Sequence, residues 1–221
     1  MSKTVVITGA NRGIGLSLTK LYQSQKCKVY ALCRESSAAL EELDVEVVPN
    51  IDLASDNLAE GLQSRFSTVD IDLLINNAGI LNNESLGSID ATTIRQQFEV
   101  NALGPLIVSE ALLPRINNNG KIGFITSRMG SIADNSSGGR YGYRMSKVAL
   151  NIAAVSMARD VESRGISVAI LHPGLVGTEM IGGVGDITPD QAAQRLALRI
   201  DEMTLQTSGT FWHSNGEVLP W

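Results

Sequence analysis

The stretch from Val5 to Leu16 constrains the fold more than any other part of the chain. It reads Val-Val-Ile-Thr-Gly-Ala-Asn-Arg-Gly-Ile-Gly-Leu, an apolar β-branched run followed by a turn that holds Gly9, Gly13 and Gly15. Apolar residues then recur at helical spacing, so the stretch predicts a strand, a tight glycine turn and a helix. Backbone without Cβ atoms approaches a phosphate closely, and the first amides of the helix point toward it. Because the spacing is the wider G-x-x-x-G-x-G, an ordinary strand-to-helix turn remains the alternative.

Length, charge and cysteine content narrow the class of protein. A chain of 221 residues suits a single domain spanning residues 1–221. The net charge of −5 argues against a nucleic-acid partner. No apolar run approaches the roughly 18 residues of a membrane span. The chain enters its first strand directly after Met1, which leaves no room for a signal peptide. Cys27 and Cys33 lack the spacing of metal ligands and are too few for a disulfide framework. We therefore expect a cytoplasmic protein with no metal site and no membrane partner.

The rest of the chain alternates between strand-like and helix-like patterns. Further strands are expected at residues 28–33, 45–48, 71–75, 121–125 and 167–171. Helical patterns occupy residues 56–66, 90–116 and 143–162, and another helix begins at Thr188 with a proline and a capping Gln.

The residues at the end of the second strand indicate which dinucleotide the chain would bind. Where a dinucleotide fold binds NAD, an acidic side chain near this point holds the ribose hydroxyls. Here Arg34 follows Cys33, and Arg12 is a second cation nearby. Two guanidiniums and no carboxylate suit a 2′-phosphate, because arginine offers a rigid charged fork to oxyanions. The alternative is two solvated surface arginines. After the third strand, Asp52 either caps a helix that begins near Ser55 or accepts a hydrogen bond from an adenine amino group, and both roles are compatible.

Polar residues stand in two segments that ought to be buried. Asn76-Asn77-Ala78-Gly79 ends the fourth strand, where the amides can tie neighbouring strands together and the glycine leaves backbone close to a ligand. Asn101 lies in the middle of a helical pattern with Gly104-Pro105 close behind, a poor choice for helix stability. Residues that disfavour the local helix in this way indicate a functional site. The alternative is a kink in the helix at Gly104.

Tyr143 and Lys147 are four residues apart and so share one helical face. At about 4 Å and an effective dielectric near 20, an ammonium stabilises a phenolate by roughly 4 kcal/mol. That would bring a phenol pKa of about 10 down toward neutrality. A phenol poised near the working pH is what a general acid or base needs. Tyr-x-x-x-Lys on its own is common by chance.

With these pieces in order, the whole chain resembles the short-chain dehydrogenase/reductase family. The matching motifs are Thr8-Gly9-x-x-x-Gly13-x-Gly15, Asn76-Asn77-Ala78-Gly79, Asn101, Ser127, Tyr143-x-x-x-Lys147 and Pro173-Gly174-x-x-x-Thr178. The run from Arg128 to Ser131, the polar loop before Tyr143 and the closing Leu-Pro-Trp are most similar to the carbonyl reductase branch of Sniffer and C-factor proteins. The resemblance implies an α/β fold, a single doubly wound Rossmann-type domain. Its sheet would have seven mostly parallel strands in the order 3-2-1-4-5-6-7, with helices on both faces.

The resemblance also implies hydride transfer between NADP(H) and a small-molecule carbonyl or alcohol, in a homodimer or homotetramer. Tyr143 would give a proton to the carbonyl oxygen, and Lys147 would lower the Tyr143 pKa and bind the nicotinamide ribose. Ser127 would polarise the carbonyl, and Asn101 would hold a water for proton relay. The expected cofactor-binding residues are Gly9, Asn11, Arg12, Gly13, Ile14, Gly15, Arg34, Asp52, Leu53, Asn77, Ala78, Gly79, Tyr143, Lys147, Pro173, Gly174, Val176 and Thr178.

The chain departs from the family pattern in two places. A few extra residues separate Ser127 from Tyr143, so Ser131 is a second candidate for the catalytic serine. The segment 179–186 is short and glycine-rich where relatives carry a longer lid, which predicts an open site of broad specificity. His172 is expected only to end its strand. The alternative function is a cofactor-binding signalling or scaffold protein of the same fold, and the intact Asn-Ser-Tyr-Lys set weighs against it.

Overall fold

A parallel sheet forms the centre of the protein, which we describe over residues 2–221 from a computed structural model. The sheet has seven strands in the order β3-β2-β1-β4-β5-β6-β7, and every neighbouring pair is parallel. The strands are β1 (Thr4–Thr8), β2 (Lys28–Leu32), β3 (Glu46–Val48), β4 (Ile71–Asn76), β5 (Ile116–Ile125), β6 (Ser167–His172) and β7 (Phe211–His213). The predicted strand order is confirmed. Val5, Val6 and Ile7 are fully buried, because both faces of a parallel sheet are covered by helices.

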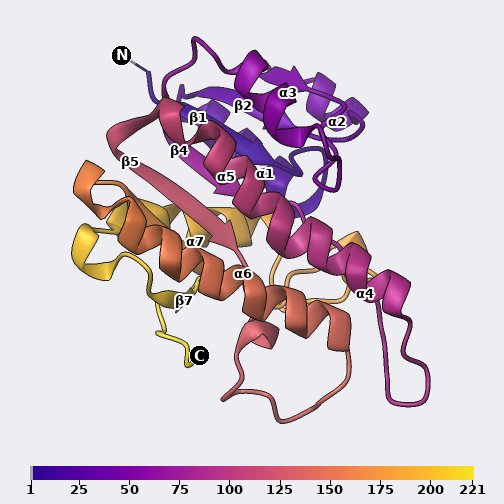
Figure 1. Ribbon diagram of the computed structural model, residues 1–221. Coiled ribbons are helices and arrows are strands. Elements are labelled where there is room, and N and C mark those ends of the chain that lie inside the picture. Colours follow the sequence, from indigo (N-terminus) through magenta and orange to yellow (C-terminus); the bar gives the residue numbers. More distant parts are fainter. Residues whose placement is uncertain (1) are drawn as a thin grey trace.

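Two helical layers cover the sheet (Figure 1). On one face α1 (Gly13–Ser24) packs against α7 (Pro189–Glu202), and a core that includes Leu18, Tyr22 and Leu196 forms beneath them. On the other face lie α3 (Leu58–Arg65), α4 (Ala91–Phe98), α5 (Gly104–Leu112) and α6 (Tyr141–Asp160). The short α2 (Ala38–Glu41) follows β2. This is the doubly wound arrangement in which ligands bind at the carboxyl ends of the strands.

The segment predicted as one long helix over residues 90–116 is wrong in detail. Between α4 and α5 the chain forms a π-helical turn, Glu99–Leu103, and β5 already begins at Ile116. Gly104 follows this turn, and a Cβ at this position would lie 2.7 Å from the Cβ and 2.9 Å from the carbonyl oxygen of Leu53. Close packing of α5 on the segment after β3 therefore requires glycine. Two other boundaries also differ: α3 begins at Leu58 and α6 begins at Tyr141, two residues before Tyr143.

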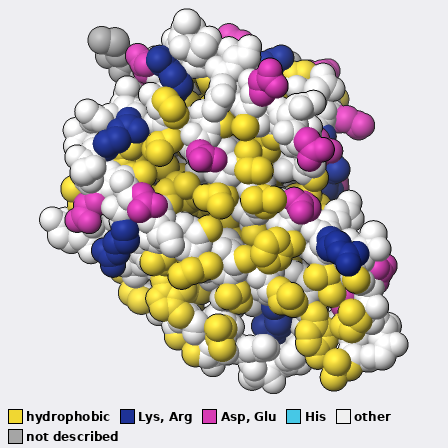
Figure 2. Space-filling view, in the orientation of Figure 1, with side chains coloured by type: hydrophobic (Ala, Val, Ile, Leu, Met, Phe, Trp, Pro, Cys, Tyr) yellow, Lys and Arg dark blue, Asp and Glu magenta, His cyan; other side chains and the backbone are white. Residues whose placement is uncertain are grey.

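The face formed by α5 and α6 is unusually apolar on its outside. Leu106 and Ile152 are 37% and 62% exposed. Figure 2 shows apolar side chains gathered across the middle of this face, with charged side chains mostly around them. A search of residues 2–221 finds no helix with the length and apolar character needed to span a membrane.

Candidate active site

A cavity of about 400 Å³ opens at the carboxyl ends of the central strands. Predicted site residues that line it are Gly9, Asn11, Arg12, Gly13, Ile14, Arg34, Asp52, Leu53, Asn77, Ala78, Gly79, Tyr143, Lys147, Pro173 and Thr178. Gly15, Asn101, Ser127, Gly174 and Val176 are not part of its lining. The volume lies within the range of small-molecule and cofactor sites.

The glycine turn forms one wall of the cavity. Gly9 and Gly13 adopt φ angles of +66° and +53°, which L side chains rarely reach. A Cβ on Gly15 would collide with the carbonyl oxygen of Gly9. Helix α1 receives no side-chain cap from Arg12 and has no acidic residue in its first turn. Its first amides are therefore directed at the cavity with the positive end of the helix dipole, a fitting cradle for a phosphate.

Asn77 and Thr8 hold this wall against the end of β4. The Asn77 side chain donates to the carbonyl oxygens of Thr8 and Gly9 at 3.0 and 3.3 Å. The Thr8 hydroxyl accepts from the amides of Asn77 and Ala78 at 3.0 and 3.1 Å. The prediction that the amide motif ties neighbouring strands is thus confirmed for Asn77.

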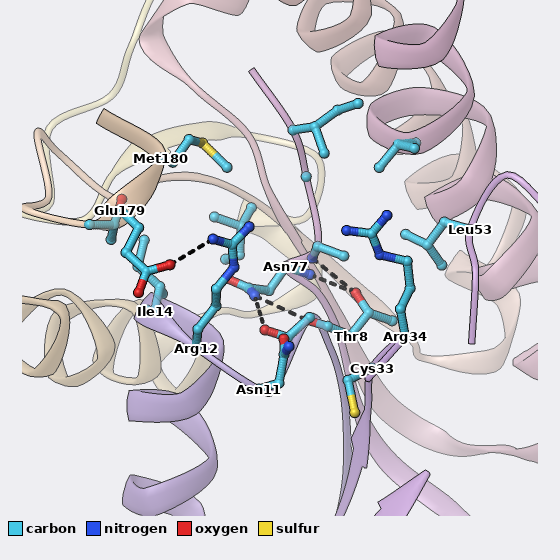
Figure 3. Close-up of a pocket in the computed structure, with 18 of the residues that line it drawn as sticks. Thr8, Asn11, Arg12, Ile14, Cys33, Arg34, Leu53, Asn77, Glu179 and Met180 are labelled. Carbon is cyan, nitrogen blue, oxygen red and sulfur yellow. Dashed lines mark hydrogen bonds and ion pairs between the residues drawn. The ribbon is translucent and has the colours of Figure 1, made fainter. Parts of the chain in front are cut away.

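The two predicted arginines take different positions around the cavity (Figure 3). Arg34 lies beside Leu53 and has an exposed side chain with no ion pair among the described residues. Arg12 pairs with Glu179 at 2.8 Å, across the gap between the glycine turn and the segment after β6. Both members of this pair are more than half exposed, so the pair adds little stability. Arg34 is the cation whose charge is directly available at this end of the cavity.

Asp52 does not cap a helix near Ser55, so that prediction is wrong. Its carboxylate accepts from the amide of Ala54 at 3.0 Å and stabilises a turn, while α3 begins only at Leu58. The short reach of an aspartate favours such a local turn over a cap six residues further on. Leu53 belongs to this turn. Its side chain is buried against Gly104 and forms part of the cavity wall.

Asn101 is fully buried in the π-helical turn. Its side-chain oxygen accepts from the amide of Ile80 at 2.8 Å. Its nitrogen donates to the Ile80 carbonyl oxygen at 2.8 Å and to the Ser146 hydroxyl at 3.0 Å. Both amide hydrogens are therefore used, and the side chain fastens the segment after β4 to α6. The structure gives Asn101 a positioning role through its side chain.

Tyr143 and Lys147 lie together on α6, and both are almost completely buried. The Lys147 ammonium donates to the Ile125 carbonyl oxygen at 3.0 Å and lies 5.7 Å from the centre of the Tyr143 ring. Burial lowers the pKa of Lys147 to about 8. Burial also raises the pKa of Tyr143, while hydrogen bonding with Ser127 and the charge of Arg140 act in the opposite direction. The predicted lowering of the Tyr143 pKa by Lys147 is wrong for these residues, because loss of hydration outweighs the neighbouring charges.

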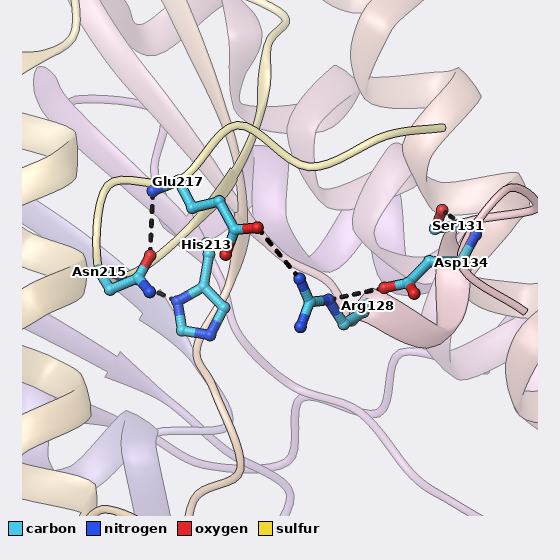
Figure 4. A network of polar contacts seen from close by, with 6 residues as sticks. All are labelled: Arg128, Ser131, Asp134, His213, Asn215 and Glu217. Carbon is cyan, nitrogen blue, oxygen red and sulfur yellow. Dashed lines mark hydrogen bonds and ion pairs between the residues drawn. The ribbon is translucent and has the colours of Figure 1, made fainter. Parts of the chain in front are cut away.

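The two candidate serines have different partners. Ser127 follows β5 and accepts from the Met129 amide at 3.1 Å, and its hydroxyl is close enough to the Tyr143 phenol to lower the pKa of that group. Ser131 accepts from the Asp134 amide at 3.0 Å. Figure 4 shows Ser131 beside Asp134, which pairs with Arg128 at 2.7 Å. The structure therefore brings Ser127 to Tyr143 and leaves Ser131 in the structure of its own loop.

His172 ends β6 as expected. Burial lowers its pKa to about 3, and its ring packs edge-to-face on His213 with 4.9 Å between ring centres. The ring stays neutral at physiological pH, so it has no proton to release in that range.

Several cavity residues were not found from the sequence. They include Ile80, Val100, Thr126, Gly177 and Glu179. Thr126 precedes Ser127, and Gly177 lies within the motif from Pro173 to Thr178. Both could have been predicted, because residues beside a motif at a strand end also reach the cavity. Val100 becomes part of the wall through the π-helical turn, which no local pattern indicates.

Comparison with known proteins shows the family of this chain. The family model for short chain dehydrogenases matches residues 3–187. The chain is 40% identical over 224 residues to 1-hydroxy-2-glutathionyl-2-methyl-3-butene dehydrogenase from Rhodococcus sp. (strain AD45), with 99% of each chain covered. It is 43% identical over 155 residues to the C-signal of Myxococcus xanthus, which covers 68% of this chain and 93% of that protein.

Among solved structures, the NADPH-bound carbonyl reductase from chicken fatty liver superimposes with a TM-score of 0.88 at 27% identity, covering 100% of this chain and 99% of the other. The chain therefore belongs to the short-chain dehydrogenase family. The predicted resemblance to its carbonyl reductase and C-factor branch is confirmed.

Proposed function

We propose that this protein is an NADP(H)-dependent oxidoreductase that reduces aldehydes or ketones to alcohols, or catalyses the reverse reaction. One observation carries the proposal: a single cavity connects the exposed guanidinium of Arg34 with the buried pair Tyr143 and Lys147. The dehydrogenase activity named for the Rhodococcus relative and the NADPH in the chicken enzyme support it.

The residues of the cavity fit an NADP(H) molecule. The glycine turn and the amides of α1 would hold the pyrophosphate, because Gly9 and Gly13 line the cavity without side chains and leave its backbone open to a phosphate. Arg34, assisted by Arg12, would hold the 2′-phosphate. Asp52 and Leu53 would lie at the adenine, and Pro173, Gly174, Val176 and Thr178 would support the nicotinamide end. The cofactor supplies the hydride.

The chain's own residues would supply the proton and the alignment. Tyr143 would donate its phenolic proton to the carbonyl oxygen as the hydride reaches the carbon. The raised pKa of Tyr143 keeps this phenol protonated at neutral pH, as a proton donor requires. Ser127, whose hydroxyl acts on the phenol of Tyr143, would bind the carbonyl oxygen and polarise it. Lys147 would bind the nicotinamide ribose, and Asn101 would fix α6 through Ser146 and support proton relay.

The proposal is tested by following the absorbance of NADPH with a panel of aliphatic and aromatic aldehydes and ketones. We expect turnover with several members, slower turnover with NADH, and broad specificity from the short segment 179–186. Preference for NADH over NADPH would refute the cofactor assignment. Preference for one carbonyl by several orders of magnitude over close analogues would refute the open site.

A second function has one observation in its favour. The Myxococcus relative is named as a signal protein, and it matches about two thirds of this chain. A signalling or scaffold role predicts NADPH binding without turnover of any carbonyl in the panel. The buried pair Tyr143 and Lys147 favours the enzymatic function over the scaffold function. Burying a lysine destabilises the fold, and binding alone gives no reason to keep a lysine there.

We also propose that the protein forms a homodimer or homotetramer. The exposed apolar side chains of α5 and α6, including Leu106 and Ile152, support self-association. Sedimentation of the wild type and of Ile152→Glu tests this proposal. We expect an oligomer for the wild type and a smaller species for the variant, and a wild type that sediments as a monomer would refute self-association.

A further inference from the structure

Glu84 is a buried carboxylate close to the start of the helix that carries Tyr143. Its side chain is enclosed in the loop between β4 and α4, and the residue is only 4% exposed. One carboxylate oxygen accepts from the Thr93 hydroxyl at 2.8 Å and from the Gln97 amide nitrogen at 2.6 Å. The other accepts from the backbone amide of Gly142 at 3.2 Å. Buried carboxylates are rare unless all their lone pairs are employed in this way.

All three partners of this carboxylate are donors. The Gln97 side-chain oxygen is occupied by the Asn82 amide at 2.9 Å, which fixes the orientation of its nitrogen toward Glu84. A carboxylate accepts hydrogen bonds at both oxygens. The side-chain NH2 of a glutamine at position 84 would instead face at least one of these three donors, and neither group could accept the other's hydrogen. The pocket therefore favours a glutamate at position 84 over the glutamine of equal size.

The Gly142 amide is one of the donors that every helix leaves unpaired in its first turn. Helix α6 begins after Arg140, whose side chain gives no cap and whose backbone is left-handed at φ 50°. No acidic residue stands in the first turn of α6. The carboxylate of Glu84 thus takes the place of a local cap and faces the positive end of the helix dipole.

Two further contacts join the same loop to the same helix end. The Glu84 carbonyl oxygen accepts from the Arg140 amide at 2.8 Å. Gly142 packs so closely on Gln97 that a Cβ at position 142 would collide with the Gln97 side-chain nitrogen. Tyr143 follows Gly142 directly, so the position of its phenol depends on how this first turn is held.

We propose that Glu84 is a positioning residue for the reaction: it caps α6 from the neighbouring loop and thereby fixes the phenol of Tyr143 against Ser127. Glu84 acts through the backbone of α6. The inference deepens the proposed carbonyl reduction and rests on it for its kinetic part. A shift of the helix end by a fraction of an ångström would separate the proton donor from the carbonyl oxygen and leave the nucleotide end of the cavity, at Arg34, unchanged.

The test compares Glu84→Gln with Asp72→Asn. Asp72 is the matched control, because its carboxylate accepts from the Thr4 amide and the Asn117 side chain, both at 2.8 Å, away from the cavity lining. For each variant we would measure the unfolding midpoint in urea, the dissociation constant of NADPH, kcat with 4-nitrobenzaldehyde and backbone amide exchange over residues 138–147. The exchange is measured on the protein alone and needs no turnover.

We expect Glu84→Gln to lower kcat by about tenfold to a hundredfold, the scale of a misplaced catalytic group, while the NADPH dissociation constant changes by less than about twofold. Exchange at Gly142 and Tyr143 should accelerate only in this variant. Asp72→Asn should lose stability and keep its kcat. Thr93→Val, which removes one donor and keeps the carboxylate, should show a smaller loss of kcat, and it carries the test if Glu84→Gln does not fold.

Equal kcat in Glu84→Gln and Asp72→Asn, or unchanged exchange over residues 138–147, would overturn the positioning role. A wild type that turns over no carbonyl would instead refute the proposed function, while the exchange measurement would still decide whether Glu84 caps α6.

Discussion

Replacing Lys147 with methionine is expected to stabilise the folded protein near neutral pH. Burial lowers the Lys147 pKa from 10.5 to about 8, a difference that corresponds to about 3 kcal/mol of unfavourable free energy for the charged form. Methionine keeps the length of the side chain and removes the charge. It also loses the hydrogen bond from the charged ammonium to the Ile125 carbonyl oxygen, which contributes about 1.5–2 kcal/mol. The net gain at pH 7 is therefore roughly 1–2 kcal/mol, or a rise in Tm of about 2–8 °C for a chain of this size.

The pH dependence distinguishes this cause from better packing. Between pH 8 and 10.5 the unfolded chain binds more protons at Lys147 than the folded chain does, so the wild type gains stability as the pH rises through this window. Below pH 8 the full cost of the buried ammonium is present. The advantage of Lys147→Met should thus be largest at pH 7 and should shrink steadily as the pH rises from 8 toward 10.5.

Urea unfolding at pH 7, 8.5 and 10 measures this gap, with Lys20→Met on the exposed surface of α1 as the control. The control should show no gap that changes with pH. A Lys147→Met protein that is less stable than the wild type at pH 7, by an amount independent of pH, would refute the reasoning. We expect the same variant to lose activity, because a charged group that costs stability is retained for function.

Three further variants test the cavity. Arg34→Ala should weaken NADPH binding by about tenfold to a hundredfold and leave NADH binding unchanged, since a charge-assisted hydrogen bond contributes roughly 1.5–3 kcal/mol; equal losses for both nucleotides would contradict a 2′-phosphate contact. Ser127→Ala should lower kcat far more than Ser131→Ala, because the Ser127 hydroxyl acts on the Tyr143 phenol whereas Ser131 bonds within its own loop, and a reversed order would make Ser131 the catalytic serine. Glu179→Gln should tighten NADPH binding modestly by releasing Arg12 from its ion pair, and weaker binding in titrations of this variant would show that Glu179 supports the nucleotide instead.

The parts of the fold that depend on neighbouring residues in the sequence were predictable. The run from Val5 to Thr8 is buried on both faces, and the glycines that follow it meet steric limits that only glycine satisfies. The strand ends gather at one edge because parallel strands point the same way. For this reason the sequence places most of the cavity lining correctly.

The parts that depend on distant contacts were not predictable. The π-helical turn contains Asn101, whose side chain bridges Ile80 and Ser146, residues far apart in the sequence. The pKa values of Tyr143 and Lys147 follow from burial, and burial is decided by packing across the sheet. The spacing correctly predicted that Tyr143 and Lys147 lie together, and it predicted the wrong direction for the pKa of the phenol.

The central claim is that Tyr143 delivers the proton in an NADPH-driven carbonyl reduction. The most direct measurement is kcat for the wild type and Tyr143→Phe with the best carbonyl of the panel, together with the NADPH dissociation constant of each protein. We predict that kcat falls on the order of 10²–10⁴-fold, the usual contribution of a general acid, while NADPH affinity changes by less than about twofold. A Tyr143→Phe protein with a kcat close to that of the wild type would contradict the claim.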